Sequence, residues 1–158
     1  MNETPEAAQA KIEQLDTFYS EAPLWAFCAA SGKAHFTMLC SACHQPNKTG
    51  TDLGPDLSGS GSNGARYFLE NIIDPNAVVG SNYEIAVVET KTGQSVSGMI
   101  ENQTETAISL RTITDTVTIS QSDIVKVTAL PQSMMPAGLL ETLNETQVVE
   151  LLKYLTAL

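Results

Sequence analysis

The sequence predicts an α+β protein in which a mostly α-helical domain is interrupted by a small antiparallel all-β subdomain. Apolar residues recur at helical spacing toward both ends of the chain, whereas they alternate with other residues over 83–128. A length of 158 residues, 42% of them hydrophobic, is sufficient for one domain that carries an insertion. We therefore expect a leader helix within 1–25, a helical domain from 26–80 and 129–158, and an inserted β subdomain at 81–128.

The first expected helix spans residues 5–19, and Pro5 suits the start of a helix. Its apolar stripe consists of Ile12, Leu15, Phe18 and Tyr19. This stripe predicts that the leader helix packs on the helical domain. The alternative, in which the leader helix forms a homodimer, stays open.

Three further helices are expected, over 26–44, over 65–73 and after Asn144. The second of them ends at Asp74 because a residue before a proline resists helical geometry. Asn144 is the expected N-cap of the last helix. The buried stripe of that helix is predicted to consist of Val148, Leu151, Leu152 and Leu155.

The β subdomain is predicted to contain about five short strands, in a meander or a small barrel. Tyr83, Ile85 and Val87 alternate with other residues, and threonine is abundant throughout the segment. Turn-forming stretches such as 91–94 separate the alternating runs. The segment is short and lies late in the chain, so we interpret it as an insertion.

The charge of the chain excludes several classes of partner. Eight Lys and Arg residues against 18 Asp and Glu residues give a net charge of −10. Such an acidic chain is a poor ligand for nucleic acid or for an anionic membrane surface.

No apolar run approaches the length of a membrane span, and the first residues do not form a signal peptide.

Cys40, Cys43 and His44 form a CxxCH motif, which is the attachment pattern of c-type haem. Two thiols at this spacing can add across the two vinyl groups of one haem, and the adjacent imidazole reaches the iron from the same side. The motif therefore predicts one covalently bound haem c, with His44 as an axial iron ligand. The alternatives are a redox dithiol, which needs a βαβ context, and half of a zinc site, which needs a second ligand pair.

A second axial ligand is expected in the segment before the last helix. A methionine thioether raises the potential of haem iron by favouring the ferrous state. Met135 directly precedes Pro136, which stiffens the loop, so Met135 is the predicted ligand. Met134, His35 or an open site are the alternatives.

Several segments resemble class I c-type cytochromes in order and spacing. These segments are 32–36, 40–44, 53–57, 135–136 and 151–155. More narrowly, the segments 54–57, 70–77 and 135–140, with the strands between them, resemble the haem-binding domain of the Planctomycetes and Verrucomicrobia type. The resemblance implies a mostly α cytochrome c fold with an inserted β segment, and a periplasmic or other extracytoplasmic location.

The resemblance also implies roles for individual residues. The carbonyl of Pro55 would accept a hydrogen bond from Nδ1–H of His44 and so orient the imidazole. Gly32 and Phe36 would cross Leu151 and Tyr154, with Gly32 permitting a close approach of the two helices.

Four other residues have two readings each. Arg66 and Tyr67 follow a Gly/Ser-rich loop and are candidates to contact a haem propionate, the alternative for Arg66 being an ordinary surface charge. Trp25 is expected in the core or at a helix contact, with a role as a propionate donor as the alternative. Cys28 is expected to be a buried inert thiol, with an intermolecular disulfide as the alternative.

These observations predict a one-electron carrier rather than an enzyme. The expected partner is a redox protein, such as a dehydrogenase, with a basic docking face. The alternatives are a haem enzyme or gas sensor with a displaceable sixth position, and an electron-accepting module of a larger quinoprotein dehydrogenase. The β insertion is expected to shield the iron, with partner docking or edge-strand association as alternatives.

Overall fold

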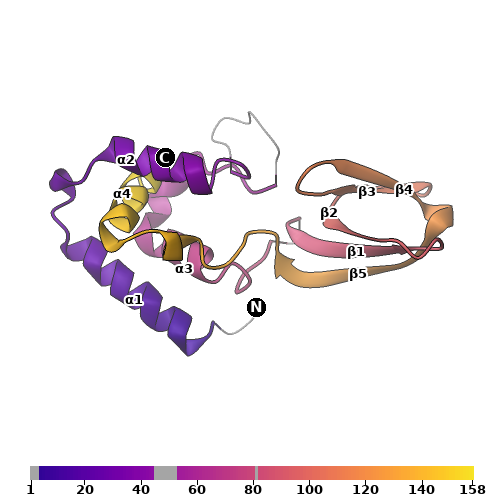
Figure 1. Cartoon of the computed structure of the whole chain (residues 1–158), viewed down its shortest axis with the longest axis horizontal. Coiled ribbons are helices and arrows are strands. Elements are labelled where there is room, and N and C mark those ends of the chain that lie inside the picture. Colours follow the sequence, from indigo (N-terminus) through magenta and orange to yellow (C-terminus); the bar gives the residue numbers. More distant parts are fainter. Residues whose placement is uncertain (1–3, 45–52, 81) are drawn as a thin grey trace. The chain divides into compact units, whose positions relative to one another are not determined.

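The computed structural model describes residues 4–44, 53–80 and 82–158 (Figure 1). The chain forms two compact units. The helical unit consists of Met1–Val78 and Met135–Leu158, and the sheet unit is Val79–Met134. Helices and one antiparallel sheet are therefore both present, which confirms the predicted α+β class. Part of the loop predicted from residue 45 lies outside the described residues.

The helical unit contains the α-helices and most of the short 3₁₀ turns. Its α-helices are α1 (Glu6–Glu21), α2 (Ala29–Leu39), α3 (Gly64–Ile73) and α4 (Glu145–Leu155). Its 3₁₀ turns are η1 (Leu24–Ala26), η2 (Ser60–Asn63) and η4 (Leu139–Thr142). Within the described residues, none of the helices is long and apolar enough to cross a bilayer.

The leader helix α1 is part of this unit. Ile12 and Leu15 are buried in the same core cluster as residues of α2, α3 and α4. The hydroxyl of Tyr19 lies 3.1 Å from Oγ1 of Thr156, just past α4. Phe18, expected on the same stripe, is instead exposed. The leader helix therefore packs on the helical domain as predicted, along a narrower stripe.

Helices α2 and α4 cross at very close range. A Cβ added at Gly32 would lie 2.7 Å from the carbonyl carbon of Glu150 and 2.9 Å from Cβ of Tyr154. The rings of Phe36 and Tyr154 pack with their centroids 5.3 Å apart. Only glycine fits at position 32, so the predicted close approach at this residue is confirmed.

Helix α4 begins as predicted, at Asn144. Its side chain accepts a hydrogen bond from the backbone N–H of Gln147, whose side chain accepts one from the N–H of Asn144. This reciprocal capping box satisfies two donors at the helix start. The predicted stripe is buried, which places Val148, Leu151, Leu152 and Leu155 in the core.

The sheet unit is one five-stranded antiparallel sheet with the order β4-β3-β2-β1-β5. Its strands are β1 (Glu84–Thr90), β2 (Ser95–Gln103), β3 (Ala107–Arg111), β4 (Thr116–Ser120) and β5 (Ile124–Ser133), with η3 (Gln121–Asp123) before β5. The unit has a core of its own, made of Ala86, Val88, Ile108, Leu110 and Ile119.

Strand β5 extends past residue 128, where the sequence pattern predicted its end. Pro131 lies in a register shift, because Leu130 pairs with Ile85 and Ser133 pairs with Glu84. The strand is also at the sheet edge. A proline is tolerated at an edge or a bulge since no ladder hydrogen bond needs its missing N–H. The pairing brings the first residue of β1 beside the last residue of β5.

Candidate haem-binding site

The CxxCH motif forms a tight turn directly after α2. The helix ends at Leu39, so the prediction of helix through residue 44 is wrong at this end. The backbone N–H groups of Cys43 and His44 both donate to the carbonyl of Cys40, at 3.1 and 2.8 Å. This turn holds both thiols and the imidazole on one short piece of chain.

Cys40 and Cys43 are half-buried and are not joined in a disulfide. Burial, with a smaller contribution from nearby Cys43, raises the pKa of the Cys40 thiol to about 11. A thioredoxin-like nucleophile needs a lowered thiol pKa, so this environment disfavours the redox dithiol. Among the described residues, no three His, Cys, Asp or Glu side chains gather in a way that could hold a metal ion.

The imidazole of His44 is oriented by the carbonyl of Pro55. Nδ1 of His44 lies 2.9 Å from that oxygen. A carbonyl only accepts hydrogen bonds, so Nδ1 carries a proton, and in the neutral ring Nε2 then keeps its lone pair. The contact expected between these two residues is present. It selects the tautomer of the neutral ring in which Nε2 is free to bind a metal.

Gly54 packs against the face of the same imidazole. A Cβ added at this glycine would lie 2.5 Å from Cε1, 2.7 Å from Nδ1 and 2.9 Å from Nε2 of His44. The N–H of Gly54 also donates to the carbonyl of Cys43 at 3.0 Å. Sequence reasoning assigned no role to Gly54, although its place directly before Pro55 was a usable signal. These contacts and the paired thiols fit a haem attached at this turn.

The two methionines after β5 differ in their surroundings. Met135 is half-buried and packs against the core cluster of the helical unit, together with Cys40 and Leu57. Met134 is the last residue of the sheet unit. Of the two, Met135 is therefore the one that contacts the same core as the attachment turn.

His35 lies at the crossing of α2 and α4. Its Nε2 is 3.1 Å from a carboxylate oxygen of Glu150, and both side chains are largely buried. His35 is one of the alternatives named above for the second axial ligand. No local pattern in the sequence could indicate the pair, because Glu150 lies in the distant helix α4. The contact makes Glu150 the polar partner of the His35 side chain.

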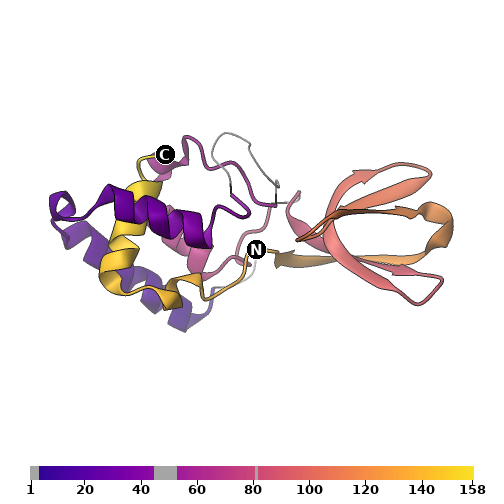
Figure 2. The ribbon, with the colours of Figure 1, turned by 45° about the horizontal axis from the view of Figure 1, so that its top comes forward.

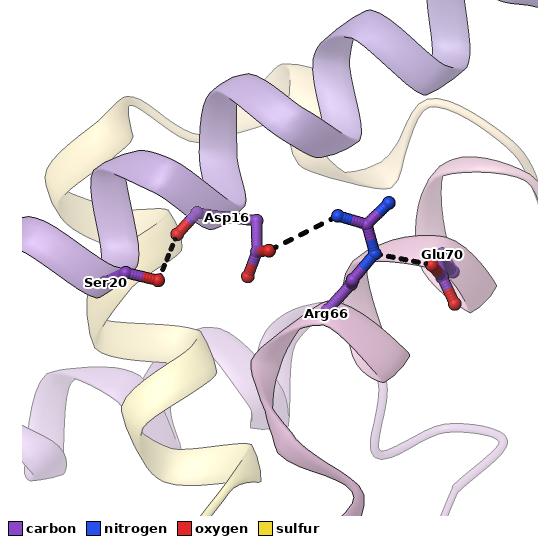
Figure 3. A network of polar contacts seen from close by, with 4 residues as sticks. All are labelled: Asp16, Ser20, Arg66 and Glu70. Carbon is purple, nitrogen blue, oxygen red and sulfur yellow. Dashed lines mark hydrogen bonds and ion pairs between the residues drawn. The ribbon is translucent and has the colours of Figure 1, made fainter.

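Arg66 links two helices of the helical unit (Figure 3). Its Nε donates to Glu70 on α3 at 2.9 Å, and its Nη1 lies 3.5 Å from a carboxylate oxygen of Asp16 on α1. The hydrogen bond to Glu70 raises the pKa of the guanidinium, which therefore stays charged. These two carboxylates are the partners of Arg66 in the structure. Its candidate role at a haem propionate stays a prediction.

Tyr67 is exposed, and its ring packs edge-on against Phe68 with the centroids 5.4 Å apart. Its candidate role at a propionate stays a prediction.

Two residues near the start of α2 differ from expectation. Trp25 is 88% exposed, and Cys28 is also exposed, so neither lies in the core. Hydrogen bonds, chiefly from the backbone of Ser31, lower the pKa of the Cys28 thiol. The apolar run 24–30 favours burial by composition, but a 3₁₀ turn as short as η1 has no periodicity from which its exposed side can be predicted.

Paired thiols, an adjacent imidazole with an available Nε2, and a mostly helical core around them define the class of covalent haem proteins. Residues 29–105 match the family Cytochrome c. The matched residues contain Cys40, Cys43, His44, Gly54 and Pro55, whereas Met135 lies beyond them. No curated protein matches the chain.

The family match supports a c-type cytochrome that binds haem and carries electrons. A cytochrome c domain carries covalently attached haem c, which is the cofactor of this protein.

Proposed function

We propose that this protein is a one-electron carrier whose single haem c is attached through Cys40 and Cys43 and ligated by His44 and Met135. The contact of 2.9 Å between Nδ1 of His44 and the carbonyl of Pro55 carries this proposal. It fixes the tautomer in which Nε2 is an iron ligand, and it does so beside the two thiols of the motif.

The protein residues have distinct tasks in this proposal. Cys40 and Cys43 would hold the haem, each thiol adding across one vinyl group, with the sulfur bonded to one vinyl carbon and the thiol proton on the other. Pro55 and Gly54 hold the imidazole of His44 in one orientation. When bound, the haem supplies an iron that alternates between the ferric and ferrous states.

Met135 would supply the second protein ligand of the haem iron in this proposal. Its packing against the helical core, where Cys40 also packs, supports its choice over Met134. A thioether ligand favours ferrous iron and so raises the reduction potential. The apolar residues of the same cluster would keep water from the iron, and electron transfer would need no bond between the cofactor and a substrate.

We also propose the setting in which this carrier works. The net charge of −10 supports a redox partner, such as a dehydrogenase, with a basic docking face. The resemblance to the Planctomycetes-type haem-binding domain supports a periplasmic or other extracytoplasmic location.

Acid-acetone extraction of the purified holoprotein tests the covalent attachment. We expect the colour to stay with the wild-type chain and with the control Cys28→Ser, because Cys28 lies outside the motif. Cys40→Ser combined with Cys43→Ser should release all pigment. Extraction of the wild-type pigment would overturn the proposal.

A carbon monoxide titration of the reduced protein tests the sixth ligand. If Met135 binds the iron, carbon monoxide should bind slowly to the wild type and rapidly to Met135→Ala. Rapid binding to the resting wild type would instead indicate an enzyme or a gas sensor with an open position.

A further inference from the structure

The carbonyl of Pro55, which orients the imidazole of His44, lies on an exposed loop. Pro55 and its neighbour Asp56 are both exposed, so burial in a core does not fix the position of this carbonyl. On one side of Pro55, the N–H of Gly54 donates to the carbonyl of Cys43 at 3.0 Å. The contacts on the other side must supply the rest of the restraint that keeps the Pro55 carbonyl 2.9 Å from Nδ1 of His44.

After Pro55 the loop consists of tight turns. The side chain of Asp56 accepts a hydrogen bond from the backbone N–H of Ser58 at 2.9 Å. The carbonyl of Leu57 accepts from the backbone N–H of Ser60 at 3.0 Å and also from the hydroxyl of Ser60. The side chain of Leu57 packs against the core of the helical unit. The loop therefore moves as one piece, so a shift of η2 would carry Pro55 with it.

The end of α4 holds these turns, and it lies beside the segment that leads into α3 (Figure 2). The N–H of Gly59 donates to the backbone oxygen of Leu158 at 3.1 Å. Gly61 is buried, and a Cβ added to it would lie 2.5 Å from the carbonyl oxygen of Thr156 and 2.7 Å from the carbonyl carbon. Only glycine therefore allows η2 to rest on the end of α4.

The end of α4 is itself fixed within the helical unit. Oγ1 of Thr156 donates to the carbonyl of Leu152 at 2.9 Å and lies 3.1 Å from the hydroxyl of Tyr19 on α1. Leu152 and Leu155 are buried in the core cluster against which Cys40 also packs. Helix α4 therefore gives η2 a rigid support that belongs to the same core as the attachment turn.

We propose that Gly61 is a positioning residue for His44. By letting η2 rest on Thr156, Gly61 keeps the Pro55 carbonyl where it accepts the hydrogen bond from Nδ1–H. This inference rests on the proposed function, in which His44 ligates the haem iron. The hydrogen bond makes the imidazole a stronger donor to the metal, which favours ferric iron. A displaced loop would weaken the bond and raise the reduction potential, a direction opposite to that expected for loss of the Met135 thioether.

Gly61→Ala in the holoprotein tests this role, with Gly64→Ala as the matched control. Gly64 follows the same 3₁₀ turn at a φ of +81°, and a Cβ added to it meets nothing within 4 Å. Both variants should lose stability. Only Gly61→Ala should raise the ratio of ferrous to ferric iron at a fixed potential, by up to about 10-fold. Equal ratios in the two variants would overturn the proposal.

Nuclear magnetic resonance of the reduced holoprotein supplies a readout that a loss of stability alone would not change. In Gly61→Ala the resonance of the His44 Nδ1 proton should move upfield, and the proton should exchange faster with solvent, because its hydrogen bond is weaker. The same resonance should stay in place in Gly64→Ala. An unmoved resonance in a folded Gly61→Ala variant would overturn the proposal.

Hydrogen exchange in the wild type tests the same role without a substitution, and it decides the matter if Gly61→Ala does not fold. The N–H of Gly59 and the Nδ1 proton of His44 should exchange through one opening event, with the same dependence on denaturant. Exchange of the Nδ1 proton while Gly59 stays protected would overturn the proposal. The absence of haem-shifted imidazole resonances from the wild type would instead overturn the proposed function, and this inference with it.

Discussion

The helical unit and the sheet unit are held together by different kinds of contact. In the helical unit, segments far apart in the chain approach until only glycine fits between them, as at Gly32 beside Glu150 and at Gly61 beside Thr156. In the sheet unit, most strands pair with their neighbour in the chain, and β1 with β5 is the exception. The residues proposed to bind the haem all lie in the helical unit, whereas the alternative ligand Met134 lies in the sheet unit.

This difference between the units indicates in which of them a substitution should change the absorbance of the haem. The attachment turn and Met135 belong to two separate stretches of the helical unit, which the crossing of α2 and α4 holds together. The sheet unit has its own core. We expect damage to the helical unit to reach the haem, and damage to the sheet to stay local.

The largest effect is expected from Gly32→Ala. Its new Cβ would meet the backbone of Glu150, so we expect a loss of about 3 kcal/mol or more in the free energy of unfolding. Gly98→Ala is the matched substitution in the sheet, where a Cβ would lie 2.6 Å from the carbonyl oxygen of Arg111. Thermal unfolding followed by haem absorbance should detect the first change and not the second. Equal shifts in both would mean that the two units unfold together.

A second large effect is expected at Gly54. In Gly54→Ala the Cβ would displace the imidazole of His44, because the two would be 2.5 Å apart. We expect a destabilisation of about 1–3 kcal/mol and a ferric spectrum that loses its low-spin character. The control Gly80→Ala places its Cβ 3.5 Å from Cδ2 of Tyr83, an ordinary contact. An unchanged spectrum in Gly54→Ala would contradict the assignment of His44.

The third prediction distinguishes Met134 from Met135 as the iron ligand. The boundary between the two units in the sequence lies between these residues. Met135→Ala should abolish the near-infrared band of ferric iron bound to a thioether. It should also lower the reduction potential by an amount on the order of 0.1 V, within the range of about 0.8 V that axial ligands span. Met134→Ala should change neither, because Met134 belongs to the sheet unit. The reverse result would assign the ligand to Met134.

The smallest effect concerns acid stability of the sheet unit. A hydrogen bond from Arg111 lowers the pKa of Glu101 below its usual 4.5. The folded state therefore gains stability above about pH 4.5 and loses it as the pH falls through the lowered pKa. We expect Arg111→Gln to flatten this loss, measured as urea midpoints of the sheet at about pH 7 and about pH 3.5. Arg66→Gln, in the helical unit, should leave the slope of the sheet unchanged.

Much of the fold could be predicted because its signals are local. The apolar period predicted α1 and α4, and alternation predicted the strands, since both patterns repeat over several residues. The end of β5 was missed because the alternation of apolar residues stops at Val127. Only the edge position and the register shift explain why the strand continues through Pro131. The exposure of Trp25 was missed because one short turn decides it.

The candidate site likewise contains residues with a local sequence signal and residues whose partners depend on the tertiary fold. Cys40, Cys43 and His44 form a contiguous motif, and Pro55 follows them closely, so their proximity could be predicted. The partners of Arg66 and His35 could not, because Asp16 and Glu150 come from other helices and leave no spacing signal. Opposite charges in a sequence are too numerous for their tertiary pairing to be read without the fold.

The pairing of Glu84 with Ser133 has a consequence for the order of folding. Joining the early and late parts of the helical unit requires closure of the chain segment between them, and each doubling of such a segment costs about 0.6 kcal/mol of entropy. Once the sheet has formed, β1 and β5 are neighbours. The chain that still has to be ordered then consists of only the two short connections before β1 and after β5. If the sheet assembles first, it would therefore reduce the entropy cost of bringing α4 to α2. Helix α4 could then pack on α2 soon after α4 has been synthesised.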